Sequence, residues 1–239
     1  MVGVPAGLVE LNAAPDAPAP GPGATGLFHV AFLVPTRRDL ALALVRLGRS
    51  RWRLTGASDH LVSEALYLDD PEGNGIEIYR DRPREDWPRQ GDGILMDTLP
   101  LDLEDVIGEL DGDPGDPGPM PEGTTIGHVH LKVADVAATE AFYAGVLGFD
   151  VMAHMPSATF MSAGGYHHHL GANVWQSRGG PPPPPGALGL RSYEVVLPSA
   201  ADVDEAERRL ASAGVEAERF DGALVAADPS ANRLKLTTA

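Results

Sequence analysis

The sequence predicts an α+β fold built from repeated β-α-β-β-β units. Two observations lead to this prediction. Residues 27–81, 126–176 and 190–237 each begin with a β-rich stretch, continue into an amphipathic helix and end in further strand-like stretches. A Pro- and Gly-rich stretch precedes each of them, at 14–25, 112–123 and 179–186. We refer to these segments as the first, second and third units.

The first unit opens with LFHVAFLV, a β-rich run, and TRRDLALALVRLG follows it. Leu40, Leu44 and Leu47 recur at helical spacing, and Gly48 is placed as a helix stop. SEALYLDD and IEIYRD then alternate as strands around the turn PEGNG. The unit is therefore expected to contain one helix among several strands.

The other two units follow the same order. In the second, the strand GHVHLKV leads to Asp135, a candidate N-cap, and to a helix that ends at Gly148. The stretches FDVMAH, ATFMSAGG and YHHHLGANVW are strand-like. In the third, RSYEVVLP precedes a helix over 199–214, and strands flank the turn DPSANR. At the N-terminus, the alternating LVELNAA predicts an orphan strand, a remnant of one more unit.

Composition excludes several classes of function. The chain has 239 residues, a net charge of −16 and no cysteine. The negative net charge argues against nucleic-acid binding, which needs a positive face. The absence of cysteine excludes disulfides, thiolate zinc sites and cysteine nucleophiles. The apolar runs are too short for a membrane helix, and the N-terminus lacks the pattern of a signal peptide. We therefore expect a soluble, cytoplasmic protein that binds neither nucleic acid nor membranes.

Histidines and a glutamate recur at equivalent places in the first two units. His29 and His128 lie on the first strands, and Glu77 lies on the last strand of the first unit. The same alignment places His169 near the corresponding point of the second unit and Lys235 in the third. Two imidazoles and one carboxylate form the facial triad that binds non-haem Fe(II), although Mn²⁺, Ni²⁺ or Zn²⁺ also suit such ligands. The alternative is that His29 is a core or surface histidine and Glu77 a solvated edge residue.

The remaining histidines allow further interpretations. Because side chains alternate along a strand, either His168 alone or His167 together with His169 is expected to point inward. The alternative is a polar edge strand. His130 shares a face with His128 and is a candidate pocket residue or alternative ligand, as are His60, His167 and His169. For His60 a hydrogen bond within a loop is an alternative role, and His154 is expected at the surface.

Four longer motifs contain the candidate site residues: GLFHVAFLVP, SDHLVSEALYLDDPEGNGIEIYRDRP, IGHVHLKVADVAATEAFYAGVLGFDV and SAGGYHHHLGANVW. Together they resemble the two-domain catechol 2,3-dioxygenase-like group of the vicinal oxygen chelate superfamily, which also contains glyoxalases and bleomycin-resistance proteins. The resemblance implies four modules in two domains. We accordingly expect an N-terminal domain over 1–110, holding the remnant and the first unit. A linker follows over 111–125, and a C-terminal domain over 126–239 holds the other two units.

The resemblance also implies an activity and site residues. It implies Fe(II)-dependent extradiol cleavage of catechol-type aromatic compounds by O₂, as in aromatic catabolism. His29, Glu77 and His128 match the metal ligands, and His168 matches the catalytic acid/base. Only LVELNAA corresponds to a first module, so we expect an N-terminally truncated chain that forms homo-oligomers. The alternatives are a glyoxalase- or resistance-type isomerase or binding protein, and an inactive relic. The first two units each carry half of a metal site, and the sequence leaves open how the halves combine.

Overall fold

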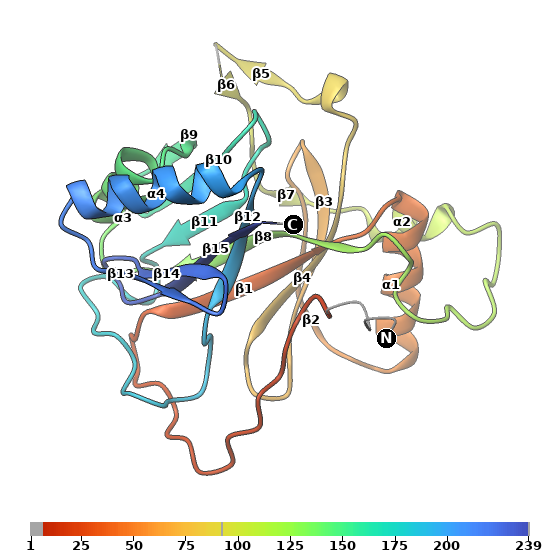
Figure 1. The fold of residues 1–239 in the computed structure, drawn as a ribbon. Coiled ribbons are helices and arrows are strands. Elements are labelled where there is room, and N and C mark those ends of the chain that lie inside the picture. The colour runs from red at the N-terminus through yellow and green to blue at the C-terminus, as the bar shows by residue number, and fades with distance from the viewer. Residues whose placement is uncertain (1–6, 92, 239) are drawn as a thin grey trace, which may run out of the picture.

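A computed structural model describes residues 7–91 and 93–238 of the chain and shows a mixed α+β fold of three repeated units (Figure 1). The first unit contains β1 (Gly26–Leu33), α1 (Arg37–Arg49), β2 (Leu54–Asp59), β3 (Ser63–Asp69) and β4 (Gly75–Asp81). The second contains β8 (Thr125–Lys132), α3 (Val136–Glu140), the π-helical turn η2 (Ala141–Val146), β9 (Asp150–Met155), β10 (Ala158–Ser162) and β11 (Leu170–Asn173). The third contains β12 (Tyr193–Leu197), α4 (Ala200–Ser212), β13 (Ala217–Phe220), β14 (Ala223–Ala227) and β15 (Arg233–Thr238).

A connecting segment with short elements joins the first two units. It contains the 3₁₀ turn η1 (Arg84–Asp86), the strands β5 (Arg89–Gln90), β6 (Gly93–Ile94) and β7 (Leu99–Pro100), and the helix α2 (Leu103–Gly108). Strands β5 and β6 form a small hairpin that projects at the top of Figure 1. Strand β7 pairs with β2 and so extends the main sheet.

The first two units share one nine-stranded sheet, in the order β7-β2-β3-β4-β1-β8-β11-β10-β9. At its centre the first strands of the two units, β1 and β8, pair antiparallel. Each of them also pairs in parallel with the last strand of its own unit, β4 or β11. The seam between the units therefore places β4, β1 and β8 next to one another, and these are the strands that carry Glu77, His29 and His128.

Helix α1 covers one face of this sheet. Leu40 and Leu44 of α1 form one apolar core with Leu66 of β3 and Ile78 of β4. Thr36 and Asp39 form a capping box that satisfies the first amides of the helix. The predicted stop at Gly48 is wrong, because α1 continues to Arg49. Arg51 takes the left-handed conformation just beyond the helix, with φ 53°.

The third unit forms its own four-stranded sheet, β12-β15-β14-β13. One apolar core joins it to the second unit and includes Phe142, Leu210 and Leu224. A buried hydrogen-bond network strengthens this contact: the Tyr193 hydroxyl lies 2.6 Å from that of Tyr143, which donates to Asp228 at 3.1 Å. The predicted helices of the second and third units are confirmed, with Asp135 and Ser199 as N-caps.

The predicted remnant strand is wrong. Residues 7–13 form no strand, and Leu8, Val9 and Leu11 are exposed. A lone strand leaves its backbone N–H and C=O groups without a ladder, so alternation alone does not create one. The segment before β8 is also free of regular structure, but Arg46 of α1 donates hydrogen bonds to the carbonyl groups of Pro117, Gly118 and Pro119. The division into domains at 111–125 stays a prediction.

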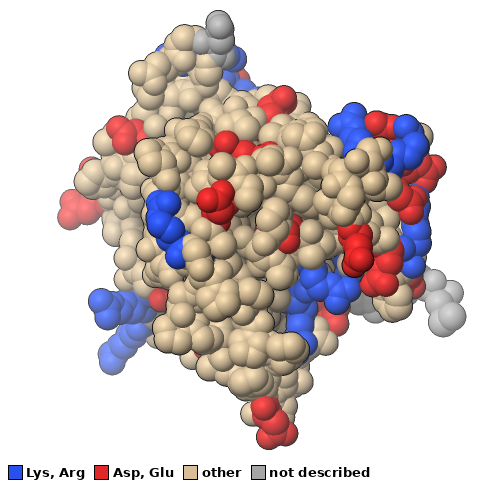
Figure 2. Space-filling model, turned by 90° about the vertical axis from the view of Figure 1, so that its left-hand side faces the viewer, with Lys and Arg blue, Asp and Glu red and all other residues tan. Residues whose placement is uncertain are grey.

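Figure 2 shows the face of the molecule that carries the left-hand elements of Figure 1, including α4. Charged side chains are scattered over a largely uncharged surface there, and the basic ones form no continuous patch on this face. Within the described ranges, no helix is both long enough and apolar enough to cross a membrane.

Candidate metal centre

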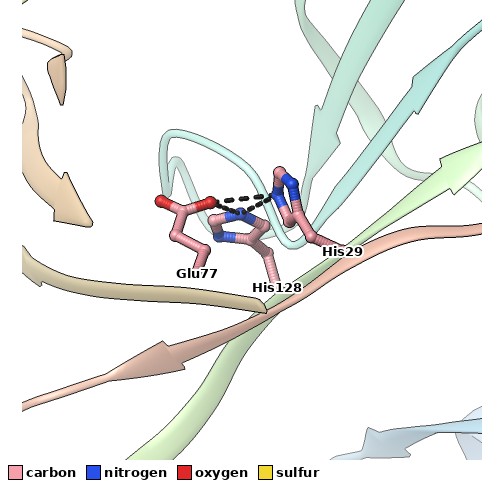
Figure 3. A group of neighbouring side chains, drawn as sticks. All are labelled: His29, Glu77 and His128. Atoms are coloured by element: carbon pink, nitrogen blue, oxygen red, sulfur yellow. Dashed lines mark hydrogen bonds and ion pairs between the residues drawn. The ribbon is translucent and has the colours of Figure 1, made fainter. Parts of the chain in front are cut away.

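Three side chains from neighbouring strands converge on one point. His29 extends from β1, Glu77 from β4 and His128 from β8, and Figure 3 shows their polar ends facing one another. Glu77 Oε2 lies 2.9 Å from His29 Nε2 and 3.0 Å from His128 Nε2, and the two Nε2 atoms are 3.2 Å apart. All three residues are buried. The structure thus brings together the three residues that the sequence singled out as ligands.

The donor set fits a divalent cation better than it fits protons. Two N–H groups that donate to Glu77 have no lone pair left for each other, so protons can satisfy at most two of the three close contacts. A cation among the three atoms satisfies all of them. In an octahedral site with bonds of about 2.1 Å, neighbouring ligand atoms lie roughly 3.0 Å apart. The observed triangle of 2.9, 3.0 and 3.2 Å matches that spacing.

The electrostatics of the centre favour metal binding as well. Burial alone raises the pKa of Glu77, but His128 and His29 outweigh it and hold that pKa well below its usual value. Burial also lowers the pKa of His128, although Glu77 opposes this shift. The centre therefore offers an ionised carboxylate and a neutral imidazole, which are the forms that bind metals. Nδ1 of His128 is buried and, among the described residues, has no hydrogen-bond partner.

A β-bulge shapes the wall beside the centre. The register between β1 and β8 shifts between Leu27 and His29, and both Phe28 and His29 line the same cavity. The Phe28 ring lies 5.1 Å from the ring of His130 and 5.2 Å from that of Trp175, measured between centroids. Simple alternation along β1 would send Phe28 to the opposite face, so its role has no signal in the sequence pattern.

The donor atoms lie in a cavity of about 590 Å³. Its lining includes the aromatic side chains of Phe28, Tyr67, Phe160 and Trp175, and the imidazoles of His60, His130 and His168. A cavity with apolar aromatic walls and a few convergent polar groups is typical of a small-molecule site. One aromatic ring fills only part of this volume, so the cavity has room for a substituted ring.

His60 and His130 border the cavity but are held by other partners. Nδ1 of His60 donates to the carbonyl of Asp97 at 2.8 Å, so its Nε2 accepts from the Tyr67 hydroxyl at 2.7 Å. Nε2 of His130 lies 3.0 Å from the side-chain amide of Asn173 and accepts its hydrogen bond. Neither residue belongs to the group of three that converges near Glu77. His154 is exposed and lies 2.7 Å from Glu140, as expected for a surface histidine.

The histidine run differs from its prediction. His167, His168 and His169 lie in the loop before β11 rather than in a strand, so the rule of alternation does not govern them. His167 and His168 are both buried, whereas His169 is exposed and contacts Ser162 and Ala163. The predicted correspondence of His169 with Glu77 is also wrong. Glu77 pairs with Ala31, two residues after His29, and the residue that pairs with His130, two residues after His128, is Gly171.

Asp81 is a neighbour of the site that the sequence analysis missed. Its carboxylate accepts a hydrogen bond from the Tyr166 hydroxyl at 2.9 Å and lies 2.8 Å from Nε2 of His167. Glu77, Tyr79 and Asp81 alternate along β4, so they share the face that carries the metal centre. This alternation along the strand is the sequence signal that could have identified Asp81 as a neighbour of the site.

Comparison with known proteins assigns the family. The profile of the glyoxalase/bleomycin resistance protein/dioxygenase superfamily matches residues 125–233. The catechol-2,3-dioxygenase of Bacillus subtilis (strain 168) is 45% identical over 208 residues, which cover 86% of this chain and 72% of that protein. The chain belongs to this superfamily, also called the vicinal oxygen chelate superfamily.

A solved structure supports the fold. A provisionally named dioxygenase from Bacillus subtilis subsp. subtilis str. 168 superimposes with a TM-score of 0.59 at 15% identity. The match covers 91% of this chain and 63% of that one, so this chain spans less than two thirds of the solved protein. The predicted α+β fold of this superfamily is confirmed.

Proposed function

We propose that this chain is a metal-dependent extradiol dioxygenase that cleaves catechol-type aromatic compounds with O₂. The observation that carries the proposal is the triangle of His29, Glu77 and His128 inside an aromatic-lined cavity. The 45% identity to a catechol-2,3-dioxygenase supports the same reaction class. The three side chains would hold Fe(II), which would supply the redox chemistry between ring and O₂.

The side chains of the cavity have clear tasks in this reaction. Phe28, Phe160 and Trp175 offer faces and edges on which an aromatic ring can stack. The hydrogen bond from Tyr67 to His60 holds another part of the cavity wall in place. His168 borders the cavity, and its ring centroid lies 4.1 Å from that of His128, so it can meet a hydroxyl of a substrate bound at the centre.

The test is reconstitution of the full chain with Fe(II) under anaerobic conditions, followed by catechol and O₂. We expect a yellow ring-fission product and one O₂ consumed per catechol, both abolished by Glu77→Ala and retained in His154→Ala. Catechol binding without O₂ uptake would refute the proposal and favour a binding protein or isomerase. Failure of the folded protein to retain metal after dialysis would refute it in favour of an inactive relic.

A further inference from the structure

Two consecutive buried histidines connect Asp81 to the cavity. His167 is fully buried, and His168 is 9% exposed. Nε2 of His167 lies 2.8 Å from Asp81 Oδ1, and its Nδ1 lies 2.9 Å from Nδ1 of His168. The series Asp81–His167–His168 therefore runs without a gap from the end of β4 to the wall of the cavity, beside His128.

The hydrogen-bonding roles along this series follow from its first member. A carboxylate oxygen accepts, so Nε2 of His167 donates to Asp81. In its neutral form, His167 then has its lone pair on Nδ1, and that atom accepts a hydrogen bond from the Nδ1–H of His168. Nδ1 thus carries the proton of His168, and Nε2 keeps a lone pair. Among the described residues, Nε2 of His168 makes no hydrogen bond, although its ring borders the cavity.

We propose that Asp81 and His167 are positioning residues that fix the Nδ1–H tautomer of His168, so that its Nε2 accepts a hydrogen bond from a substrate hydroxyl. The inference rests on the proposed function for the identity of that hydroxyl, which belongs to the aromatic diol. The placement of the acceptor rests on the two hydrogen bonds alone.

Neighbouring contacts hold the series in place. The second carboxylate oxygen of Asp81 accepts from Tyr166, so the carboxylate is fixed at both ends. The His167 ring lies between aromatic neighbours, with centroid distances of 4.1 Å to Tyr166 and 5.3 Å to Trp87. On its cavity side the His168 ring meets Phe160 at 5.1 Å. A ring held on both sides presents its acceptor in one direction, which favours a defined orientation of the substrate.

The tautomer can be measured without turnover. The full chain, labelled with ¹⁵N and loaded with diamagnetic Zn²⁺, gives long-range ¹H–¹⁵N correlations whose pattern distinguishes the two tautomers of each histidine. The signals of His168 are those that vanish in His168→Gln. We expect His168 to be protonated at Nδ1 in the wild type. Protonation at Nε2 would overturn the proposal. This measurement is made on the wild type, so apart from the assignment with His168→Gln it does not depend on whether any variant folds.

Variants of His167 separate positioning from packing. The Gln side chain in His167→Gln can donate to Asp81 and accept from His168, so the tautomer should persist. His167→Phe keeps a ring but removes the acceptor, so the Nδ1–H tautomer should no longer dominate. A His168 spectrum unchanged in folded His167→Phe would contradict the proposal.

Binding and kinetics complete the test. With 4-nitrocatechol as probe, His167→Phe should bind at least about tenfold more weakly than the wild type, which corresponds to about 1.4 kcal/mol. His167→Gln should stay within about threefold of the wild type, and kcat/KM for catechol should follow the same order. If the wild type shows the expected tautomer but cleaves no ring, the proposed function fails while the positioning role stands. If it cleaves catechol with His168 protonated at Nε2, the inference fails alone.

Discussion

Gly171 occupies in the second unit the position that Glu77 occupies in the first. Gly171 pairs with His130 in the parallel ladder between β11 and β8, as Glu77 pairs with Ala31 between β4 and β1. A Cβ atom at Gly171 would lie 2.7 Å from Nδ1 of His130. The second unit therefore has an imidazole where the first has space for a carboxylate, and residues of both units form one candidate metal centre.

Gly171→Ala should consequently destabilise the protein by about 1–3 kcal/mol, because the buried His130 ring has to move. Gly48→Ala is the matched control, since a Cβ atom at Gly48 would have no neighbour within 4 Å and alanine favours a helix. It should be neutral or stabilising by up to about 1 kcal/mol. Urea unfolding measures both effects, and an unchanged midpoint for Gly171→Ala would contradict the close packing of the His130 ring on Gly171.

Metal content tests the centre directly. After anaerobic loading with Fe(II) and dialysis, Glu77→Ala and His128→Ala should each lose most of the bound iron, because each removes one of the three proposed ligands. His154→Ala should retain it, since His154 lies at the surface with Glu140. Elemental analysis gives the stoichiometry, and circular dichroism verifies the fold. Unchanged iron in folded Glu77→Ala would show that Glu77 has only a structural role.

The sequence predicted the repeated units and the three convergent residues because both depend on periodicity. Alternation assigns a face to each strand residue, and repetition aligns His29 with His128. The pairing of β1 with β8 did not follow, because strand order depends on contacts between distant segments. Phe28 escaped prediction because a bulge changes its face. The joint burial of His167 and His168 did so because their segment is a loop, where strand alternation does not apply.

The turns before β4 and β15 provide a pair of reciprocal predictions. Asp70 and Asp228 begin the two turns, and their carboxylates accept equivalent hydrogen bonds from Asn74 and Asn232. The residue before each asparagine has a left-handed backbone conformation: Gly73 has φ 85° and Ala231 has φ 64°.

Ala231→Gly should therefore stabilise the protein by up to about 1 kcal/mol, because relief of the left-handed strain exceeds the added freedom of the unfolded chain. Gly73→Ala should destabilise it by about 1 kcal/mol. The difference in thermal midpoint between each variant and the wild type checks both signs. A loss of stability in Ala231→Gly would show that the Ala231 side chain makes favourable contacts that outweigh the strain.

The turn at Asp70 also predicts a dependence of stability on pH. Burial acts to raise the pKa of Asp70, but hydrogen bonds from Asn74, Glu72 and Gly73 outweigh it and leave this pKa below its usual value. The ionised form thus stabilises the fold above the unfolded-state pKa of about 3.9, and this contribution is lost as the pH falls through the folded-state pKa. Asp70→Ala should cost about 1 kcal/mol at pH 7 and progressively less below pH 4. A difference from the wild type that stays constant from pH 7 to pH 3 would contradict this.

The buried Glu64 carboxylate pairs with three arginines. Of all these substitutions, its removal should lower the free energy of unfolding most. The Glu64 carboxylate is 2% exposed, accepts from Arg37 at 2.9 and 3.1 Å and from Arg80 at 2.7 Å, and lies 3.3 Å from Arg82. Its loss leaves these guanidinium groups without their shared partner, which typically costs about 3–5 kcal/mol in a buried pair. Arg219→Ala is the matched control, because Arg219 pairs with Asp204 and Glu207 at the surface and should contribute at most about 1 kcal/mol. Urea unfolding of Glu64→Ala and Arg219→Ala gives the comparison, and similar losses in the two variants would show that burial adds nothing to the Glu64 cluster.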